Sequence, residues 1–182
     1  MILSMLKKFF IFLWEIIQTV VIAFLIVLPI RYFVFQPFLV RGHSMEPNFH
    51  QGDYLLVDEL SFRFREPKRG EVIVFKYPPR PQLRYIKRII GLPGEEVVIK
   101  NGLVLINGKI LNESEYLPPN TKTEGYVEIK LGENEYFVLG DNRNASSDSR
   151  FWGPLKKENI IGRVFFRAWP ISALAKIEPP AY

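Results

Sequence analysis

Three short segments carry the side chains that could do chemistry in this chain of 182 residues. They lie at residues 42–47 (GHSMEP), 85–88 (YIKR) and 140–150 (GDNRNASSDSR). A serine hydroxyl, such as that of Ser44, is a weak nucleophile until a neighbouring base takes its proton. The sequence therefore indicates covalent catalysis by a serine, provided that the fold brings a base to that hydroxyl.

The base for Ser44 is either a histidine or a lysine. His43 is adjacent, but neighbouring side chains of an extended chain point to opposite faces, and His50 has the character of a surface residue. A lysine acts as a base near neutral pH only if burial lowers its pKa from about 10.4. Lys87 lies in the apolar run YIKRII, which could desolvate an amine, yet alternation does not decide whether Lys87 or Arg88 points inward. Because lysine is seldom buried without a partner, the residues alone favour two solvated cations.

Composition excludes several other kinds of chemistry. The chain has no cysteine, which rules out disulfides, zinc–thiolate sites and a cysteine nucleophile. With two histidines in all, a histidine-rich metal site is not expected, and we expect no cofactor. The formal net charge of +5 comes from bases interspersed with acids. We therefore expect no nucleic-acid partner, and a mixed surface with mild attraction to anionic lipid.

The first element that must position these segments is an apolar run at residues 9–30. A helix needs roughly 20 such residues to cross a bilayer, so this run is long enough. We expect an uncleaved anchor, because no small-residue cleavage pattern follows the run, and residues 1–8 then form a short cytoplasmic N-terminus. A buried core helix is disfavoured, since no later segment is apolar enough to pack against it. The basic residues on its two sides barely discriminate an orientation.

Residues 31–182 are expected to form one β-rich domain outside the membrane. Short β-branched and aromatic runs bounded by turn residues predict strands at residues 54–57, 71–75, 97–99, 103–106, 136–139 and 164–166. The dipeptides Asn101-Gly102 and Asn107-Gly108 predict tight turns, and hence a meander. No later segment has a convincing amphipathic helical pattern. We predict a mainly β fold, an antiparallel sheet or barrel-like catalytic domain on a single transmembrane helix, with residues 112–125 as an exposed excursion.

Together these segments resemble the ordered motif set of the bacterial type I signal peptidases, a serine–lysine protease family. The resemblance covers nearly the whole chain and rests on SMEP, GEVIVF, YIKRIIGLPG and GDNRNASSDSR in the family's order. It implies a membrane-bound endopeptidase that removes signal peptides from exported preproteins by cleaving after a small residue. The implied location is the cell membrane, with one span and an extracytoplasmic catalytic domain. The implied partners are signal peptides and membrane lipid, with the protein export machinery as a further candidate.

The resemblance also implies roles for individual residues in catalysis. Ser44 matches the nucleophile, Lys87 the general base, and Ser146 the hydroxyl that orients the lysine amine. The supporting positions are an ion pair and two residues that shape the loop: Asp148 with Arg150, then Asp141 and Arg143.

The resemblance further implies how the substrate and the oxyanion are bound. Some members carry a serine two residues before the nucleophile, where this chain has Gly42. The oxyanion would then rest on backbone N–H groups, chiefly that of Ser44. The positions that match the substrate pocket are aromatic or apolar, consistent with selection for alanine-sized residues: Phe38, Val40, Met45, Phe49, Tyr85 and Ile86.

Two other classes of protein remain open at the level of sequence. A self-cleaving regulator with serine–lysine chemistry would carry a DNA-binding module instead of an anchor, and no recognition helix is visible. A non-catalytic, membrane-tethered β module that binds peptide strands would not need Ser44, Lys87 and Ser146 together. The distance between the Ser44 hydroxyl and the Lys87 amine discriminates the enzyme from the binder.

Overall fold

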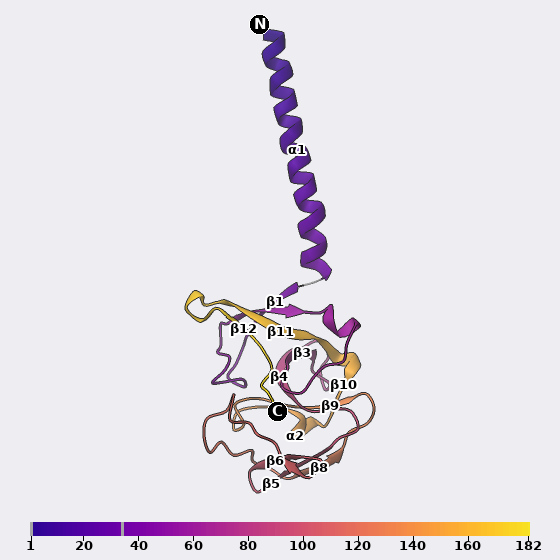
Figure 1. The fold of residues 1–182 in the computed structure, drawn as a ribbon, viewed down its shortest axis with the longest axis vertical. Helices are drawn as coiled ribbons and strands as arrows, with labels where there is room; N and C mark the ends of the chain where they lie inside the picture. The colour runs from indigo at the N-terminus through magenta and orange to yellow at the C-terminus, as the bar shows by residue number, and fades with distance from the viewer. Residues whose placement is uncertain (1, 34) are drawn as a thin grey trace. The chain divides into compact units, whose positions relative to one another are not determined.

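The computed structural model describes the backbone of residues 2–33 and 35–182, and the side chains of residues 7–25, 27 and 36–182. The chain divides into two compact units, Met1–Gln36 and Pro37–Tyr182. The first unit is a long helix, and the second is built mainly from strands (Figure 1).

The helix α1 (Ile2–Phe33) contains a stretch, Lys7–Leu25, that is apolar and long enough to cross a membrane. Its 19 residues have a mean hydropathy of 1.9, and none of this window is buried. At a rise of about 1.5 Å per residue, such a stretch spans roughly the hydrocarbon core of a bilayer. The anchor expected at residues 9–30 falls within α1, although the side chains of residues 26 and 28–30 lie outside the described ones.

The β unit contains two sheets whose registered strand pairs are all antiparallel. The larger sheet has the order β1-β2-β11-β3-β4-β9-β10, and β12 pairs with β11. Its strands are β1 (Phe35–Leu39), β2 (Tyr54–Asp58), β3 (Val72–Lys76), β4 (Arg84–Gly91), β9 (Glu135–Leu139), β10 (Leu155–Lys156), β11 (Ile160–Trp169) and β12 (Ala175–Lys176). The prediction of a mainly antiparallel β fold that follows an N-terminal helix is confirmed.

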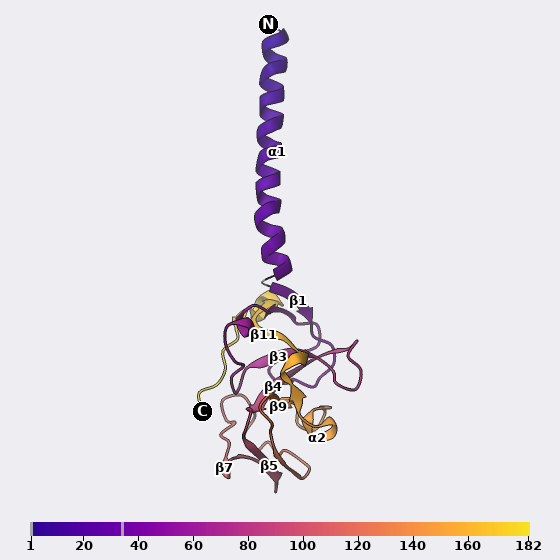
Figure 2. The ribbon, with the colours of Figure 1, turned by 90° about the vertical axis from the view of Figure 1, so that its right-hand side faces the viewer.

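The smaller sheet has four strands in the order β7-β6-β5-β8. They are β5 (Glu96–Lys100), β6 (Leu103–Ile106), β7 (Lys109–Ile110) and β8 (Val127–Lys130). The dipeptides Asn101-Gly102 and Asn107-Gly108 turn between β5, β6 and β7 with positive φ angles of 53°, 79°, 49° and 76°. Two-residue hairpin turns of the favoured hand require positive φ at both central positions, so the predicted meander is confirmed. In Figures 1 and 2 this sheet lies at the end of the β unit opposite β11.

Helices after α1 are short, as the lack of amphipathic patterns predicts. They are α2 (Ser149–Trp152) and three 3₁₀ turns, η1 (Ser61–Arg63), η2 (Lys157–Asn159) and η3 (Ile171–Ala173). The N-cap of α2 is Asp148, whose side chain accepts a hydrogen bond from the Arg150 N–H. An aspartate at this position satisfies one of the first free N–H groups of a helix.

Strand β4 lies in the interior of the larger sheet, between β3 and β9. Every residue from Ile86 to Gly91 is buried, without the alternation of a half-exposed strand. Its two faces belong to different hydrophobic clusters, one containing Ile86 and the other Ile89. Any polar side chain on this strand is therefore withdrawn from water.

The predicted exposure of residues 112–125 is wrong at three positions. Tyr116 and Leu117 are each 7% exposed, and Thr123 is 1% exposed, although most of the segment is open to solvent. The aromatic ring of Tyr116 lies against the Arg88 guanidinium, 4.2 Å from ring centroid to carbon. The segment is therefore docked on the β unit through contacts that its own polar composition does not reveal.

Candidate active site

Lys87 and Ser44 meet at the start of the buried part of β4. The Lys87 Nζ donates hydrogen bonds to the Ser44 Oγ at 2.7 Å and to the Ile86 carbonyl oxygen at 2.8 Å. Ser44 lies in the turn between β1 and β2, which is closed by a hydrogen bond from the Glu46 N–H to the His43 carbonyl. The distance between the Lys87 Nζ and the Ser44 Oγ, which discriminates an enzyme from a strand binder, is therefore short enough for direct proton transfer.

Burial gives Lys87 the acid–base character of a catalytic amine. Its residue is 3% exposed, and desolvation lowers its pKa from 10.5 to about 8, against the opposing charges of Asp148 and Asp141. At pH 7 roughly one molecule in ten would then carry the neutral amine. The expectation of two solvated cations is wrong, because Arg88 is also buried, at 4% exposure. Both lie on an interior strand that is covered on its two faces.

Replacing Lys87 by Met is expected to stabilise the β unit at pH 7. A lysine with a lowered pKa binds fewer protons in the folded state than in the unfolded state between pH 8 and 10.5. Its burial therefore opposes folding fully below about pH 8, by on the order of 3 kcal/mol. The gain in Lys87→Met should shrink as the pH rises toward 10.5. Urea unfolding of the full chain at pH 7 and pH 10 measures this, and a destabilised variant at pH 7 would contradict it.

The His43 side chain contacts Glu46 and not Ser44. Its Nδ1 lies 2.7 Å from the Glu46 Oε1, and its side chain is 63% exposed. This geometry agrees with the expectation that the histidine adjacent to the nucleophile is badly placed to serve it.

Gly140 and Ser146 bring the segment 140–150 against Ser44. A Cβ on Gly140 would lie 2.2 Å from the Ser146 Oγ and 2.4 Å from the Ser44 carbonyl oxygen, so only glycine fits there. Ser146 is 7% exposed, and its Oγ has no hydrogen-bond partner among the described residues. The structure thus brings Ser146 to the site, but the hydrogen bond to the Lys87 amine that the resemblance implies is not formed.

Asp148 and Arg150 form a buried, two-pronged ion pair. The Arg150 Nε and Nη2 donate to the Asp148 Oδ1 at 2.8 Å and Oδ2 at 2.9 Å. Their side chains are 0% and 6% exposed, so this is not an ordinary surface pair, which would contribute little. The Asp148 Oδ2 also accepts the Gly140 N–H at 3.1 Å. The pair therefore holds the end of β9 and the loop that follows it.

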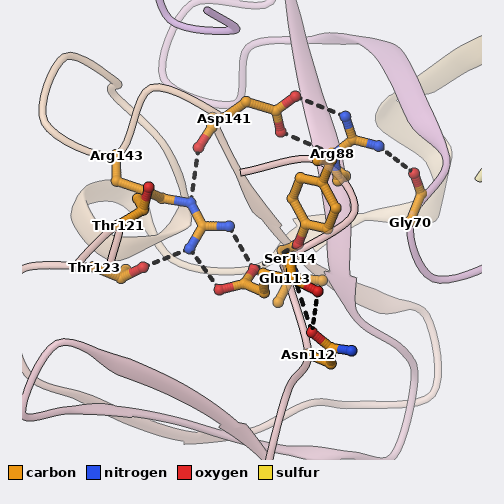
Figure 3. Close-up of polar contacts among 12 residues, drawn as sticks. Gly70, Arg88, Asn112, Glu113, Ser114, Thr121, Thr123, Asp141 and Arg143 are labelled. Atoms are coloured by element: carbon orange, nitrogen blue, oxygen red, sulfur yellow. Dashed lines mark hydrogen bonds and ion pairs between the residues drawn. The ribbon is translucent and has the colours of Figure 1, made fainter. Parts of the chain in front are cut away.

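Asp141 and Arg143 lock the same loop through two further ion pairs (Figure 3). Asp141 accepts hydrogen bonds from the Arg88 Nε at 2.8 Å and Nη2 at 2.6 Å. Arg143 donates to both carboxylate oxygens of Glu113, at 2.5 and 3.0 Å, and to the Thr123 hydroxyl. Charge-assisted pairs of this two-pronged kind are among the stronger polar contacts in proteins. The docked segment 112–125 therefore supports the loop that packs on Ser44.

Asn48 is a site residue that sequence reasoning missed. Its Nδ2 donates to the Tyr116 carbonyl at 2.7 Å and to the Asp141 Oδ2 at 2.8 Å. These contacts tie the turn that contains Ser44 to Asp141, 93 residues further along the chain than Asn48. An asparagine just after a proline is typical of a turn, and that signal does not point to a distant partner. Arg88 and Glu113 were missed as supports for the same reason.

A cleft of about 700 Å³ opens over the serine and the lysine. Its lining residues are Pro37, Phe38, Leu39, Arg41, Gly42, His43, Ser44, Gln82, Leu83, Arg84, Tyr85, Ile86, Lys87 and Ala145. Three of the expected pocket residues thus line it: Phe38, Tyr85 and Ile86. The other three differ from the expectation, because Val40, Met45 and Phe49 are packed in the hydrophobic cluster of Ile86 and are at most 2% exposed.

The chain is similar to known proteins over the region that contains these residues. Residues 13–169 match the family described as signal peptidase, peptidase S26. A probable signal peptidase I-2 from Synechocystis sp. is 40% identical, over 86% of this chain and 73% of its own length. The signal peptidase I of Leptolyngbya laminosa is 39% identical, over 92% and 85%. A crystal structure of a signal peptidase I from Enterococcus faecalis V583 is 32% identical, with a TM-score of 0.48, over 55% of this chain and 97% of its own.

The signal peptidase I of Bacillus licheniformis is similar over still more of its own length. It is 36% identical over 91% of this chain and 94% of the relative. The family match spans most of the chain and includes all three segments with candidate catalytic residues. The chain therefore belongs to the peptidase S26 family of signal peptidases, and it is a serine peptidase of the signal peptidase I type.

Proposed function

We propose that the chain is a membrane-anchored endopeptidase that cleaves signal peptides from preproteins with Ser44 as nucleophile and Lys87 as general base. The contact between the Lys87 Nζ and the Ser44 Oγ, at 2.7 Å, is the observation that carries the proposal. The lowered pKa of Lys87 supports it, because a lysine with its ordinary pKa would be protonated at neutral pH.

The proposed reaction has two halves. The neutral Lys87 amine accepts the Ser44 proton, and the Ser44 Oγ attacks the carbonyl carbon of the small residue that ends the signal peptide. The peptide C–N bond then breaks as the Lys87 ammonium gives its proton to the leaving amine. A water molecule, deprotonated by Lys87, attacks the carbonyl carbon of the resulting ester, the ester C–O bond breaks, and the Lys87 ammonium gives its proton to the departing Ser44 Oγ. Lys87 is therefore neutral at the start of each half and neutral again at its end.

The Ser44 backbone N–H is the proposed donor to the oxyanion. Within residues 36–182 it has no hydrogen-bond partner, and it lies at the cleft that also contains Gly42. One such donor typically contributes about 3 kcal/mol to lowering the barrier. Gly42 has no side chain, and a Cβ built there would meet nothing within 4 Å, so the space at this position is open.

The substrate is proposed to bind as an added strand beside β4. Residues from Arg84 to Arg88 pair with β3 on one side, whereas the registered pairing with β9 on the other side begins at Arg88. The first part of β4 thus offers an open edge next to Tyr85 and Ile86 at the cleft. An extended peptide on such an edge gains backbone hydrogen bonds and places alternate side chains in pockets.

The anchor is proposed to be α1, within which residues 9–30 would span the cell membrane. Residues 1–8 would then be cytoplasmic, and residues 31–182 extracytoplasmic, where exported preproteins emerge. A fully extended chain from residue 30 to Ser44 reaches at most roughly 50 Å. The nucleophile would therefore stay near the lipid headgroups, where a membrane-inserted signal peptide presents its cleavage site.

The pH dependence of cleavage tests Lys87 as the base. We expect kcat/KM to rise about tenfold per pH unit below pH 8 and to level off above it, since the amine must be neutral to accept a proton. The measurement is the cleavage rate of a fluorogenic signal-peptide substrate by the full chain in detergent, from pH 6 to pH 9.5. Enzyme returned from each pH to pH 8 before assay controls for unfolding. A rate that is constant over this range would reject Lys87.

A further inference from the structure

We infer that Asn142 is a positioning residue whose side-chain amide aims the Ser44 backbone N–H at the oxyanion. This inference rests on the proposed function. The Asn142 Nδ2 donates a hydrogen bond to the His43 carbonyl at 3.1 Å, and its backbone N–H donates to the Ser44 carbonyl at 3.1 Å. One residue therefore holds the two peptide units on either side of the nucleophile.

The direction of the Ser44 N–H follows from the planarity of the peptide bond. The His43 carbonyl and the Ser44 N–H belong to one peptide unit, and in the trans form they point in opposite directions. The carbonyl accepts two donors, the Glu46 N–H of its own turn at 3.2 Å and the Asn142 amide from the facing loop at 3.1 Å, and by fixing the carbonyl they also fix the direction of the N–H. A hydrogen bond accepted by the carbonyl also polarises the unit and strengthens its N–H as a donor. The amide of Asn142 thus acts on the oxyanion through the peptide unit, without touching the substrate.

The backbone of Asn142 is held from both sides. Its neighbours Asp141 and Arg143 are 2% and 3% exposed, and each is locked in an ion pair, with Arg88 and with Glu113 (Figure 3). The side chain of Asn142 therefore projects from a rigid segment toward the nucleophile turn. Electrostatic stabilisation of an oxyanion depends on donors that are fixed before the reaction begins, and this arrangement supplies that rigidity.

The test compares substitutions at Asn142 with matched substitutions at Asn144, which lies in the same loop and is exposed. We expect Asn142→Ala to lower kcat by roughly 10- to 100-fold with little change in KM, because the donor is misdirected in the transition state. Asn142→Asp, which has the same shape but lacks the N–H donor, should lose at least as much. Asn144→Ala and Asn144→Asp should stay within about twofold of the parent enzyme, which controls for loop flexibility and for added charge.

A peptide aldehyde gives a readout that a purely structural role would not change. The Ser44 Oγ adds to the aldehyde carbon, and the serine proton passes through Lys87 to the adduct oxygen, which occupies the oxyanion position. We expect the affinity for this aldehyde to fall by the same factor as kcat/KM, whereas KM for the peptide stays constant. The pH midpoint near 8 should also remain, because Lys87 is not altered. The hydrogen bond of Asn142 is exposed, so the urea midpoint should be unchanged.

The outcomes separate this inference from the proposed function. If Asn142→Ala keeps kcat within twofold, or loses no more affinity for the aldehyde than for the peptide, the positioning role is overturned. A fall in kcat that comes with an equal loss of folded protein also overturns it. Ser44→Ala is assayed beside these variants, and cleavage retained in that variant would reject the proposed function itself.

Discussion

Replacing Ser44 by Ala is expected to abolish signal-peptide cleavage, with kcat at least roughly 10⁴-fold lower than in the parent enzyme. The serine Oγ forms the covalent bond to the substrate in the proposed mechanism, and alanine offers no atom in its place. Lys87→Met should lose activity to the same extent, since the 2.7 Å contact makes the two groups one catalytic unit. For the same reason the double variant should be no worse than either single variant.

Preprotein processing by the full chain in detergent or in lipid vesicles measures this loss. Ser147→Ala is the matched control, because Ser147 is an exposed serine of the adjacent loop and should keep full activity. The Ser44→Ala variant should still bind a signal peptide. This binding distinguishes a variant that has lost only catalysis from one that has also lost its substrate-binding cleft. Processing that continues in Ser44→Ala or in Lys87→Met would refute the assignment of these two residues as the catalytic pair.

Replacing Asp141 by Ala is expected to destabilise the β unit by about 3–5 kcal/mol. Asp141 and Arg88 have side chains that are 0% and 5% exposed, and the variant would leave the arginine charge buried without its partner. The remaining hydrogen bond of Arg88, to the Gly70 carbonyl, and its contact with the Tyr116 ring do not neutralise that charge. The Asn48 amide would also lose one of its two acceptors.

The double variant Arg88→Met with Asp141→Leu is the control for this prediction. It removes both charges and keeps apolar volume in the site, and such replacements are often neutral for stability. We expect it to recover most of the free energy of unfolding that Asp141→Ala loses, as measured by urea titration of the full chain at pH 7. A loss in the double variant as large as in Asp141→Ala would show that the contribution is not that of a buried ion pair.

Local sequence rules predicted the apolar helix, the meander and six of the strands. The Asn-Gly dipeptides at 101–102 and 107–108 adopt positive φ angles because the favoured hairpin turns need them, wherever the hairpin lies in the protein. The apolar helix at the N-terminus is equally local, since its length and composition depend on no other segment. The residues of the candidate catalytic pair also came from the sequence, through the resemblance of their motifs.

The supports of the site could not be read in the same way, because their partners are distant in the chain. Glu113 and Arg143 are 30 residues apart, and Asn48 and Asp141 are 93 residues apart. A carboxylate in a polar segment has the same local pattern whether it is solvated or paired. For this reason residues 112–125 were expected to be exposed, whereas Glu113 and Tyr116 dock the segment on the active-site loop.

The sequence by itself determined which residues are available for the chemistry, and which strands, turns and apolar helix carry them, because these depend on near neighbours in the chain. The tertiary structure alone decided that Lys87, and not Arg88, is placed to act on Ser44 as the proposed base. Alternation along β4 left Lys87 and Arg88 equivalent, whereas packing buried both and gave them different partners: a serine hydroxyl for the lysine and a carboxylate for the arginine. The physical reason is desolvation, which lowers the pKa of an amine only where other strands exclude water from both of its sides.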